Sequence, residues 1–343
     1  MQEIYLITDY NDRFGSKYTA IPYRSGMNKA VLSEEFANQG FKVIFLKASE
    51  VFEKIKKPEG LIFLYTSLED KNSHYKSFIE DVIYALSLSG AYVIPGYRYL
   101  KGHNNKVFIE LLRKQIGAYF GDNLSSHVFG SYEELKASDI NFNFPVVLKS
   151  AEGFKSRNVY LIYNKKELFR TVKKISRTVN LKEEIKDIVR KVYYKDFKRE
   201  SFYRRKFIVQ DFIPGLDKDY KILVFGDKYY VLGRYTRKND FRASGSGNFY
   251  FPENLPDGLL DFSEKIFSLL DVPVISLDVG YDSNNFYVFE LQVVFFGTYT
   301  IEKSDFYFQK KNREWEKVRG KSILEREYAL SMARYIRRKG LLK

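Results

Sequence analysis

The first hundred residues alternate between segments typical of β-strands and segments typical of helices. Short apolar runs rich in Ile, Val, Phe and Tyr indicate strands at residues 3–8, 41–46, 61–66 and 91–96. Residues 25–40 and 73–90 have helical periodicity, and each segment ends in a glycine, which commonly stops a helix. This β-α-β-β-α-β order predicts a small, mostly parallel α/β domain at residues 1–102.

The rest of the chain mixes strands and helices in the way that is typical of an α+β part. Further strands are predicted at residues 144–150, 158–163, 205–213, 274–282 and 286–294, with a hairpin at 219–237 that turns at Gly226 and Asp227. Helices are predicted at residues 106–120, within 165–200, at 257–271 and at 322–340. The last of these carries its apolar residues on one face: Leu324, Tyr328, Met332, Tyr335 and Ile336.

Composition excludes several classes of protein. The chain has 343 residues, of which 45% are hydrophobic, enough for two or three domains with a large core. It has no cysteine and three histidines, which excludes disulfides and a cysteine nucleophile and argues against a histidine-rich metal site. The N-terminus has early acidic residues and no long apolar run, and no stretch approaches the ~18 apolar residues of a membrane span. We therefore expect a cytoplasmic protein without a signal peptide.

The positive charge is concentrated in one segment. The chain has a net charge of +14, and residues 165–206 hold sixteen Lys/Arg and six Asp/Glu, a net of +10. Such a segment can bind nucleic acid, an anionic membrane surface or an acidic substrate, or it can form an ordinary solvated helical face.

Two acidic residues interrupt the apolar strands predicted near the C-terminus. Asp278 lies in the first strand and Glu290 in the second, and a short turn at residues 283–285 allows the two strands to pair antiparallel. Alternate residues share a face of a strand, so Gln292 lies on the same side as Glu290. Burying a carboxylate costs several kcal/mol without a partner. Two carboxylates and an amide oxygen suit Mg²⁺, and an arginine partner is the alternative.

Two further features suit a nucleotide. Lys149 ends an apolar strand and precedes a loop with Gly153, where a glycine permits close approach to a phosphate and a lysine supplies charge. The loop does not match the Walker pattern, and an ordinary hairpin is the alternative. At residues 208–226 a strand runs into Asp211 and a Pro-Gly turn, which suits either an adenine pocket or an ordinary strand and turn.

The order of these features resembles the ATP-grasp superfamily, in particular its ATP-dependent carboxylate–amine ligases. The resemblance covers residues 95–300, and residues 1–95 look like the Rossmann-like domain that usually precedes that fold. It implies an α/β chain with three parts: a pre-ATP-grasp domain at 1–102, an N-terminal lobe with a basic helical insertion at 103–206, and a C-terminal lobe with the metal site at 207–343.

The resemblance also implies residues that bind the nucleotide. The phosphate-binding residues would be Lys106, Lys149 and Gly153, with the loop at 151–157 closing over the phosphates. The hinge that reads adenine would be Gln210, Asp211, Phe212 and Ile213, where Asp211 stands in place of the usual glutamate. Asp219 looks like the acidic residue near the ribose, with Asp217 as a competitor.

Catalytic and metal-binding residues follow from the same resemblance. Arg234 and Arg242 match arginines that hold the γ-phosphate and the acyl-phosphate, and Lys221 stands where a basic residue faces the transferred phosphate. Asp278 and Glu290 match the two magnesium carboxylates, and Gln292 stands where the family usually has asparagine. The implied cofactors are ATP and Mg²⁺, with Mn²⁺ as an alternative metal.

The implied reaction joins a small-molecule carboxylate to an amine through an acyl-phosphate and releases ADP and phosphate. A cell-surface polysaccharide precursor or another acidic metabolite is one class of substrate. Residues 14–28, with Lys17, Tyr18, Tyr23 and Arg24, would either grip an acidic group of the substrate or form a surface loop.

Other functions stay open at this point. The chain could bind ATP for regulation without ligase chemistry, or transfer phosphate to a hydroxyl as a kinase does. It could bind a polyanion through residues 165–206, although the acids in that segment and the lack of a recognised motif argue against nucleic acid. A membrane-surface contact of the same segment and a homodimer are further alternatives.

Overall fold

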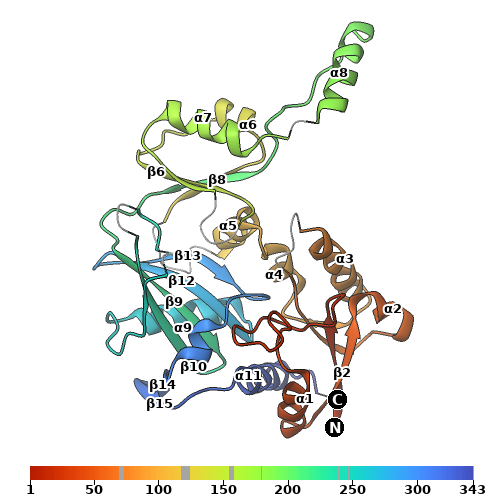
Figure 1. Ribbon diagram of the computed structural model, residues 1–343, viewed down its shortest axis with the longest axis vertical. Coiled ribbons are helices and arrows are strands. Elements are labelled where there is room, and N and C mark those ends of the chain that lie inside the picture. Colours follow the sequence, from red (N-terminus) through yellow and green to blue (C-terminus); the bar gives the residue numbers. More distant parts are fainter. Residues whose placement is uncertain are drawn as a thin grey trace. The chain divides into compact units, whose positions relative to one another are not determined.

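The computed structural model describes residues 1–68, 73–116, 124–153, 158–178, 180–237, 240–243, 245 and 247–342. Their internal contacts divide the chain into two compact units. Unit 1 consists of Met1–His103 together with Leu216–Lys343, and unit 2 consists of Asn104–Gly215. Figure 1 traces the chain from red at the N-terminus to blue at the C-terminus.

The N-terminal part of unit 1 is a parallel sheet covered by helices, as the alternation in the sequence predicts. The sheet has the strand order β2-β1-β3-β4. Its strands are β1 (Gln2–Thr8), β2 (Phe41–Lys47), β3 (Ile62–Tyr65) and β4 (Tyr92–Ile94). Its helices are α1 (Lys29–Asn38), α2 (Val51–Lys54, after the 3₁₀ turn η1, Ala48–Glu50), α3 (His74–Leu88) and α4 (Tyr97–Gly102). Because β1 is buried on both faces, Ile4 packs in one apolar cluster with α1, and Tyr5 packs in another with α3.

The C-terminal part of unit 1 is built on an antiparallel sheet with the strand order β13-β12-β9-β10-β14-β15, and β11 pairs with β10. Its strands are β9 (Lys218–Phe225), β10 (Lys228–Tyr235), β11 (Phe249–Tyr250), β12 (Val274–Tyr281), β13 (Phe286–Gln292), β14 (Phe306–Lys311) and β15 (Glu314–Arg319). The helices here are α9 (Leu259–Leu270), α10 (Tyr299–Lys303) and α11 (Leu324–Arg338). The predicted hairpin is confirmed, because β9 and β10 pair around Gly226, which has a φ of 60°.

The last helix joins the two ends of the chain into one unit. The apolar face of α11 packs in one core cluster with Phe36 of α1 and with Leu223 of β9. Tyr328 of α11 contacts the ring of Phe36 edge-on, with 6.4 Å between ring centroids. The predicted amphipathic helix is therefore confirmed, and its apolar face explains why residues 1–103 and 216–343 form one compact unit.

Unit 2 is a four-stranded antiparallel sheet with the strand order β5-β8-β6-β7. Its strands are β5 (Ser126–Phe129), β6 (Val146–Ser150), β7 (Val159–Ile162) and β8 (Phe207–Asp211). Its helices are α5 (Lys106–Ile116), α6 (Tyr132–Ala137), α7 (Lys165–Ile175) and α8 (Leu181–Tyr193). Phe207 and Val209 of β8 pack in the apolar cluster that contains residues of α6 and α7. The intervening residue Gln210 points to the other face and contacts α5.

The predicted fold class, α/β with an α+β arrangement after the first hundred residues, is confirmed. The sequence analysis did not foresee β5, α6, α10 or the β14–β15 hairpin. The predicted division into three parts, with boundaries at residues 102 and 206, stays a prediction. The two compact units are defined by internal contacts and do not test those three parts. Within the described part of the chain, every helix is too short or too polar to cross a membrane.

Candidate functional site

One face of the antiparallel sheet in unit 1 carries charged side chains across four adjacent strands. The strand register pairs Arg234 of β10 with Asp219 of β9. Two residues further along β9, Lys221 pairs with Asp278 of β12, and Asp278 pairs in turn with Glu290 of β13. Because alternate residues of a strand share a face, these side chains lie on one side of the sheet. The expected neighbourhood of Asp278 and Glu290 is therefore confirmed.

Arg234 is the centre of this group. Its side chain is 6% exposed, and it donates from Nε and Nη2 to the two oxygens of Asp219 at 2.6 and 2.8 Å. Its Nη2 also lies 2.8 Å from Oδ2 of Asp278. A buried carboxylate thus has an arginine partner, which is the alternative that the sequence left open for this strand. The sequence analysis assigned Arg234 to phosphate, and in this structure its guanidinium bonds two carboxylates.

The electrostatics of the two aspartates differ. Burial raises the pKa of Asp219 to about 6, against the attraction of Arg234. Burial also acts to raise the pKa of Asp278, but Arg234 and Lys221 together outweigh it, so the pKa of Asp278 lies below its usual value. Near neutral pH we therefore expect both aspartates to be negatively charged, next to the positive charges of Arg234 and Lys221.

The oxygens at Asp278 fit a divalent cation. Oδ1 of Asp278 is buried and has no hydrogen-bond partner among the described residues. The Nζ of Lys221 lies 3.6 Å away from it and donates to Ser276 at 2.8 Å instead. Gln292 donates to Oε1 of Glu290 at 3.4 Å, which leaves its amide oxygen for another partner. Within the described ranges there is no group of three or more His, Asp or Glu placed to hold a metal. A cation here would rest on two carboxylates and an amide oxygen, a set that Mg²⁺ accepts.

A strand irregularity lies directly beside these oxygens. The register of β12 against β13 shifts between Asp278 and Val279, so that Glu290 pairs with Asp278 while Val288 pairs with Val279. Such bulges re-aim neighbouring side chains. The next row of the sheet needs a glycine, because a Cβ on Gly280 would lie 2.4 Å from the ring of Phe289.

Unit 2 holds a second group of charged side chains, on the face of its sheet that α5 covers. Lys149 of β6 donates from Nζ to Oε1 of Gln210 at 2.6 Å. Gln210 is buried, and its Nε2 donates to Oε1 of Glu110 at 3.3 Å. Glu110 in turn accepts from Ser126 at 2.6 Å and pairs with Arg113 at 3.3 Å. The network fixes the amide of Gln210 and holds Lys149 at the end of its strand.

Lys106 and Gly153 also lie together in unit 2. Lys106 opens α5 and donates from Nζ to the carbonyl oxygen of Gly153 at 2.6 Å. The N–H of Gly153 donates to Oδ1 of Asn104 at 3.1 Å, and Gly153 has a φ of 129°, which favours glycine. Lys155, Ser156 and Arg157 of the predicted phosphate loop lie outside the described residues.

Lys206 is a further candidate phosphate ligand that was not predicted from the sequence. Its Nζ donates to Oδ1 of Asn105 at 2.8 Å, and the N–H of Ala151 donates to its carbonyl oxygen at 3.2 Å. Lys206 therefore lies beside the start of α5, as Lys106 does. The available signal was its position immediately before β8, the strand that pairs with the end of β6.

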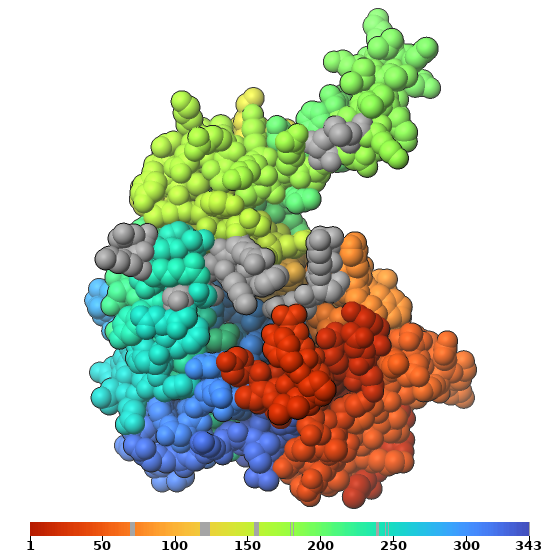
Figure 2. All heavy atoms as spheres, viewed as in Figure 1, coloured from red at the N-terminus to blue at the C-terminus, as the bar shows by residue number. Residues whose placement is uncertain are grey.

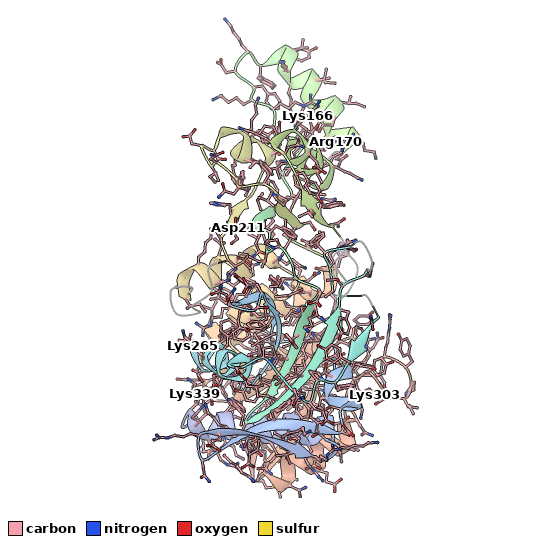
Figure 3. The ribbon with its side chains drawn as sticks, turned by 90° about the vertical axis from the view of Figure 1, so that its left-hand side faces the viewer. Lys166, Arg170, Asp211, Lys265, Lys303 and Lys339 are labelled. Carbon is pink, nitrogen blue, oxygen red and sulfur yellow. The ribbon has the colours of Figure 1, made fainter. Side chains whose placement is uncertain are left out.

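The predicted hinge lies at the end of β8. Asp211, labelled in Figure 3, is the last residue of that strand. Its N–H donates to the carbonyl oxygen of Ser125 at 3.0 Å. Phe212 and Ile213 follow and are partly exposed. Of the two ribose candidates, Asp217 is exposed, whereas Asp219 is buried with both oxygens bonded to Arg234.

Arg242 is paired with Asp240. Its backbone N–H and its Nε donate to Oδ1 of Asp240 at 3.0 and 2.9 Å, and its Nη2 donates to Oδ2 at 2.7 Å. This pairing lowers the pKa of Asp240, chiefly through the side-chain hydrogen bond. A bidentate arginine of this kind holds its guanidinium plane in a defined orientation.

Comparison with known proteins identifies the architecture. No family model and no curated protein matches the sequence. The structure is similar to that of a D-cycloserine synthetase, with a TM-score of 0.56 and 9% identity over 97% of this chain and 99% of that chain. It is also similar to an N5-carboxyaminoimidazole ribonucleotide synthetase in complex with ADP, with a TM-score of 0.51 and 11% identity over 89% of this chain and 73% of that chain. The chain has the ATP-grasp fold.

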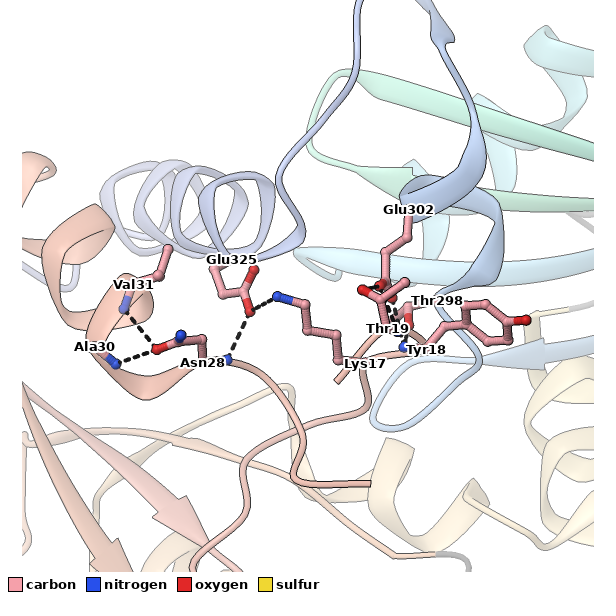
Figure 4. Close-up of polar contacts among 9 residues, drawn as sticks. All are labelled: Lys17, Tyr18, Thr19, Asn28, Ala30, Val31, Thr298, Glu302 and Glu325. Carbon is pink, nitrogen blue, oxygen red and sulfur yellow. Dashed lines mark hydrogen bonds and ion pairs between the residues drawn. The ribbon is translucent and has the colours of Figure 1, made fainter. Parts of the chain in front are cut away.

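The N-terminal loop of this ATP-grasp chain is held by two glutamates (Figure 4). The Nζ of Lys17 lies 2.6 Å from Oε1 of the buried Glu325, which also accepts from the N–H of Asn28 at 2.8 Å. Glu302 accepts from the N–H groups of Tyr18 and Thr19 at 2.7 and 2.9 Å. The loop is therefore fastened to α10 and α11.

The fastening decides which side chains of the loop remain available to a ligand. Lys17 forms an internal ion pair with Glu325. An acidic substrate, which the sequence suggested as a partner of Lys17, would have to compete with Glu325 for it. Tyr23 is 78% exposed, and the guanidinium of Arg24 lies over its ring at 5.2 Å from the centroid. Sequence reasoning did not find Glu302 or Glu325, because both act on a segment some three hundred residues away.

Proposed function

We propose that this chain is an ATP- and Mg²⁺-dependent ligase that joins a small-molecule carboxylate to an amine. The observation that carries the proposal is the register pair of Asp278 and Glu290 on the ATP-grasp fold, with an unbonded carboxylate oxygen on Asp278 beside Arg234 and Lys221. A protein that only binds ATP has less need of two adjacent carboxylates together with a buried arginine and a partly buried lysine.

Each group of residues has a part in this proposal. Asp278, Glu290 and the amide oxygen of Gln292 would hold Mg²⁺, or Mn²⁺ in its place, and the bound metal would neutralise charge on the β- and γ-phosphate oxygens. Lys221, Arg234 and Arg242 would offset the charge that develops on the transferred phosphate.

The residues of unit 2 would bind the nucleotide. Lys106, Lys149 and Gly153 would contact its phosphates, and we add Lys206 to this set because it lies beside Lys106 at the start of α5. The segment Gln210–Ile213 would read the adenine edge with its backbone. Asp219 or Asp217 would take the ribose hydroxyls, and the exposure of Asp217 supports it as the more accessible of the two.

The proposed reaction has two steps. An oxygen of the substrate carboxylate attacks the γ-phosphorus of ATP, the bond from that phosphorus to the bridging oxygen breaks, and ADP leaves. The amine nitrogen then attacks the acyl carbon, phosphate leaves, and the nitrogen loses a proton. The side chains contribute position and charge, and no cysteine or histidine nucleophile is needed. This agrees with a chain that has no cysteine and three histidines.

Nucleotide analysis by chromatography tests the proposal. The chain would be given Mg-ATP with a small-molecule extract of its source cells, beside Asp278→Asn and Glu290→Gln variants. Glu316→Gln is the matched control, because Glu316 is an exposed glutamate on β15 of the same sheet. We expect ADP and phosphate in equal amounts only with extract, from the parent and the control but not from the two site variants.

The other products separate the competing functions. ADP without phosphate would indicate a kinase, and AMP would contradict the acyl-phosphate route. Mg-ATP binding measured by calorimetry, without turnover in any extract fraction, would favour a protein that binds ATP for regulation.

A further inference from the structure

Helix α8 in unit 2 presents an apolar stripe that its own unit does not cover. Ile185, Ile188, Val189 and Val192 follow the spacing of three and four residues that places side chains on one face of a helix. They are 65%, 58%, 49% and 78% exposed, although branched apolar side chains are normally buried. Figure 1 shows α8 projecting away from β6 and β8 of its unit, and Figure 2 shows the same green segment standing out from the rest of the unit.

The charged residues of α8 are ordered around this stripe. At 3.6 residues per turn, Glu183 and Asp187 each point about 160° away from Ile185. Both acids are neutralised by neighbours, since Lys186 lies 2.7 Å from Glu183 and Arg190 lies 2.7 Å from Asp187. The third acid of the helix, Glu184, is paired with Arg199. The exposed residues Lys182, Lys186 and Lys191 flank the stripe on its two sides.

The segment that carries α8 begins and ends at one anchored point. The N–H of Thr178 donates to the carbonyl oxygen of Phe202 at 2.8 Å, and the N–H of Arg205 donates to that of Ser176 at 3.0 Å. Ser176 is fully buried. The described residues between these bonds, 180–201, therefore form an arm with a fixed base. Tyr193 and Tyr194 at the end of its helix are 79% and 66% exposed.

The helix that precedes the arm adds positive charge. The outer residues of α7 are exposed and basic: Lys165, Lys166, Arg170, Lys173 and Lys174 (Figure 3 labels Lys166 and Arg170). Residues 165–206 together have a net charge of +10. An anionic surface would therefore be attracted to the same part of unit 2 that exposes the apolar stripe.

We propose that the arm of residues 180–201 is a membrane-surface contact that lays the stripe of α8 into the interface of an anionic lipid bilayer. Such a surface accounts for both observations: the acyl boundary takes the Ile and Val side chains, and the headgroups take the flanking lysines. Nucleic acid accounts for the charge but not the stripe, because bases stack on aromatic rings rather than on branched aliphatic side chains. A second copy of the chain accounts for the stripe but brings together two segments of the same strong positive charge. This inference goes beyond the proposed function and does not depend on it.

Flotation of the full chain with vesicles tests the proposal. The vesicles are phosphatidylcholine alone, or phosphatidylcholine mixed with phosphatidylglycerol. The stripe variant is Ile188→Ser/Val192→Ser, and the flank variant is Lys182→Gln/Lys186→Gln/Lys191→Gln. Leu88→Ser is the matched control, because Leu88 is 71% exposed at the end of α3 in unit 1. Unchanged circular dichroism and thermal unfolding are expected for all variants, since the altered side chains are exposed.

We expect the parent and the control to bind the anionic vesicles and not the neutral ones. The stripe variant should bind at least about tenfold more weakly than the parent, because it loses apolar area that would leave water on binding. The flank variant should also bind more weakly, and the parent's binding should fall as salt is raised. Failure of the parent to bind anionic vesicles would overturn the proposal. Unchanged binding of the stripe variant would also overturn it. So would analytical sedimentation in which the parent, the control and the flank variant are dimers and the stripe variant alone is a monomer.

Discussion

Replacing Arg234 with methionine removes the guanidinium that bonds both Asp219 and Asp278, while it keeps most of the apolar length of the side chain. The side chain of Arg234 is 6% exposed, bonds Asp219 twice and contacts Asp278 once, at 2.6 to 2.8 Å. The cation left nearby is Lys221, whose Nζ lies 3.6 Å from Asp278. The variant therefore leaves two largely buried carboxylates with the single positive charge of Lys221 beside Asp278.

The expected loss of stability depends on pH. Breaking a buried ion pair from one side costs about 3–5 kcal/mol, because the remaining charge is buried without compensation. The pKa of Asp219 is raised to about 6 with Arg234 in place, and without it the pKa rises further. A group whose folded pKa exceeds its unfolded pKa favours the folded state at low pH and loses that contribution as pH rises through the folded pKa. We therefore expect the full loss at pH 8 and a loss of about 1–2 kcal/mol at pH 5, where Asp219 is neutral.

Urea unfolding at the two pH values measures this loss. The fluorescence of Trp315, the single tryptophan, reports on unit 1 because it lies in β15 of the same sheet. Arg338→Met is the control: its partner is Asp271 at 2.9 Å, but the arginine side chain is 59% exposed, so about 1 kcal/mol or less is expected. The double variant Arg234→Met/Asp219→Asn should recover part of the loss. A loss under about 1 kcal/mol at pH 8, or an equal loss at both pH values, would refute the reasoning.

Four further outcomes are expected. Asp219→Asn should remove a decline of roughly 2–3 kcal/mol in the parent's free energy of unfolding between about pH 4 and pH 6, and parallel pH profiles of parent and variant would contradict this. Lys149→Met should weaken Mg-ATP binding about tenfold or more in calorimetry with little change in melting temperature, and unchanged affinity would remove Lys149 from the nucleotide site. Glu302→Gln should speed proteolytic cleavage in residues 17–25, since a neutral amide replaces the carboxylate that accepts two backbone N–H groups, and an unaltered cleavage rate would show that Glu325 alone holds the loop. Gly233→Ala should destabilise unit 1 by about 1–3 kcal/mol, because the new Cβ would lie 2.2 Å from the ring of Tyr250, and an unchanged melting temperature would mean that β11 moves aside at little cost.

The sequence was sufficient to predict the arrangement of the candidate site where two strands are joined by a short turn. The turn between β12 and β13 is only a few residues long, so the pairing of Asp278 with Glu290 followed from the two strands and their alternation. The same holds for the hairpin at Gly226, which places Lys221 and Arg234 on neighbouring strands. The residues alone suited a metal, a phosphate and an adenine but left ordinary structural alternatives open, and the resemblance to ATP-grasp ligases supplied the individual roles, which stay predictions.

Partners that are distant along the chain were out of reach. Nothing in the residues around Asp278 indicates that Arg234, on a strand that is not its neighbour, reaches across β9 to its Oδ2. Lys206 lies beside Lys106 only because β8 pairs with β6 in the folded unit. The hold of Glu302 and Glu325 on the N-terminal loop likewise joins opposite ends of the sequence.

The sequence by itself determined most local elements: the parallel β/α order of the first hundred residues, the hairpins that turn at Gly226 and at residues 283–285, the charged helices and the amphipathic last helix. It could do so because the spacing of apolar residues reflects which side of each element meets the core. Only the tertiary structure decided that α11 packs against α1 and joins residues 1–103 to residues 216–343, and that the stripe of α8 is left exposed. A periodic apolar face indicates that one side of a helix can be buried. Which surface packs against that side depends on how all the other elements of the chain are packed.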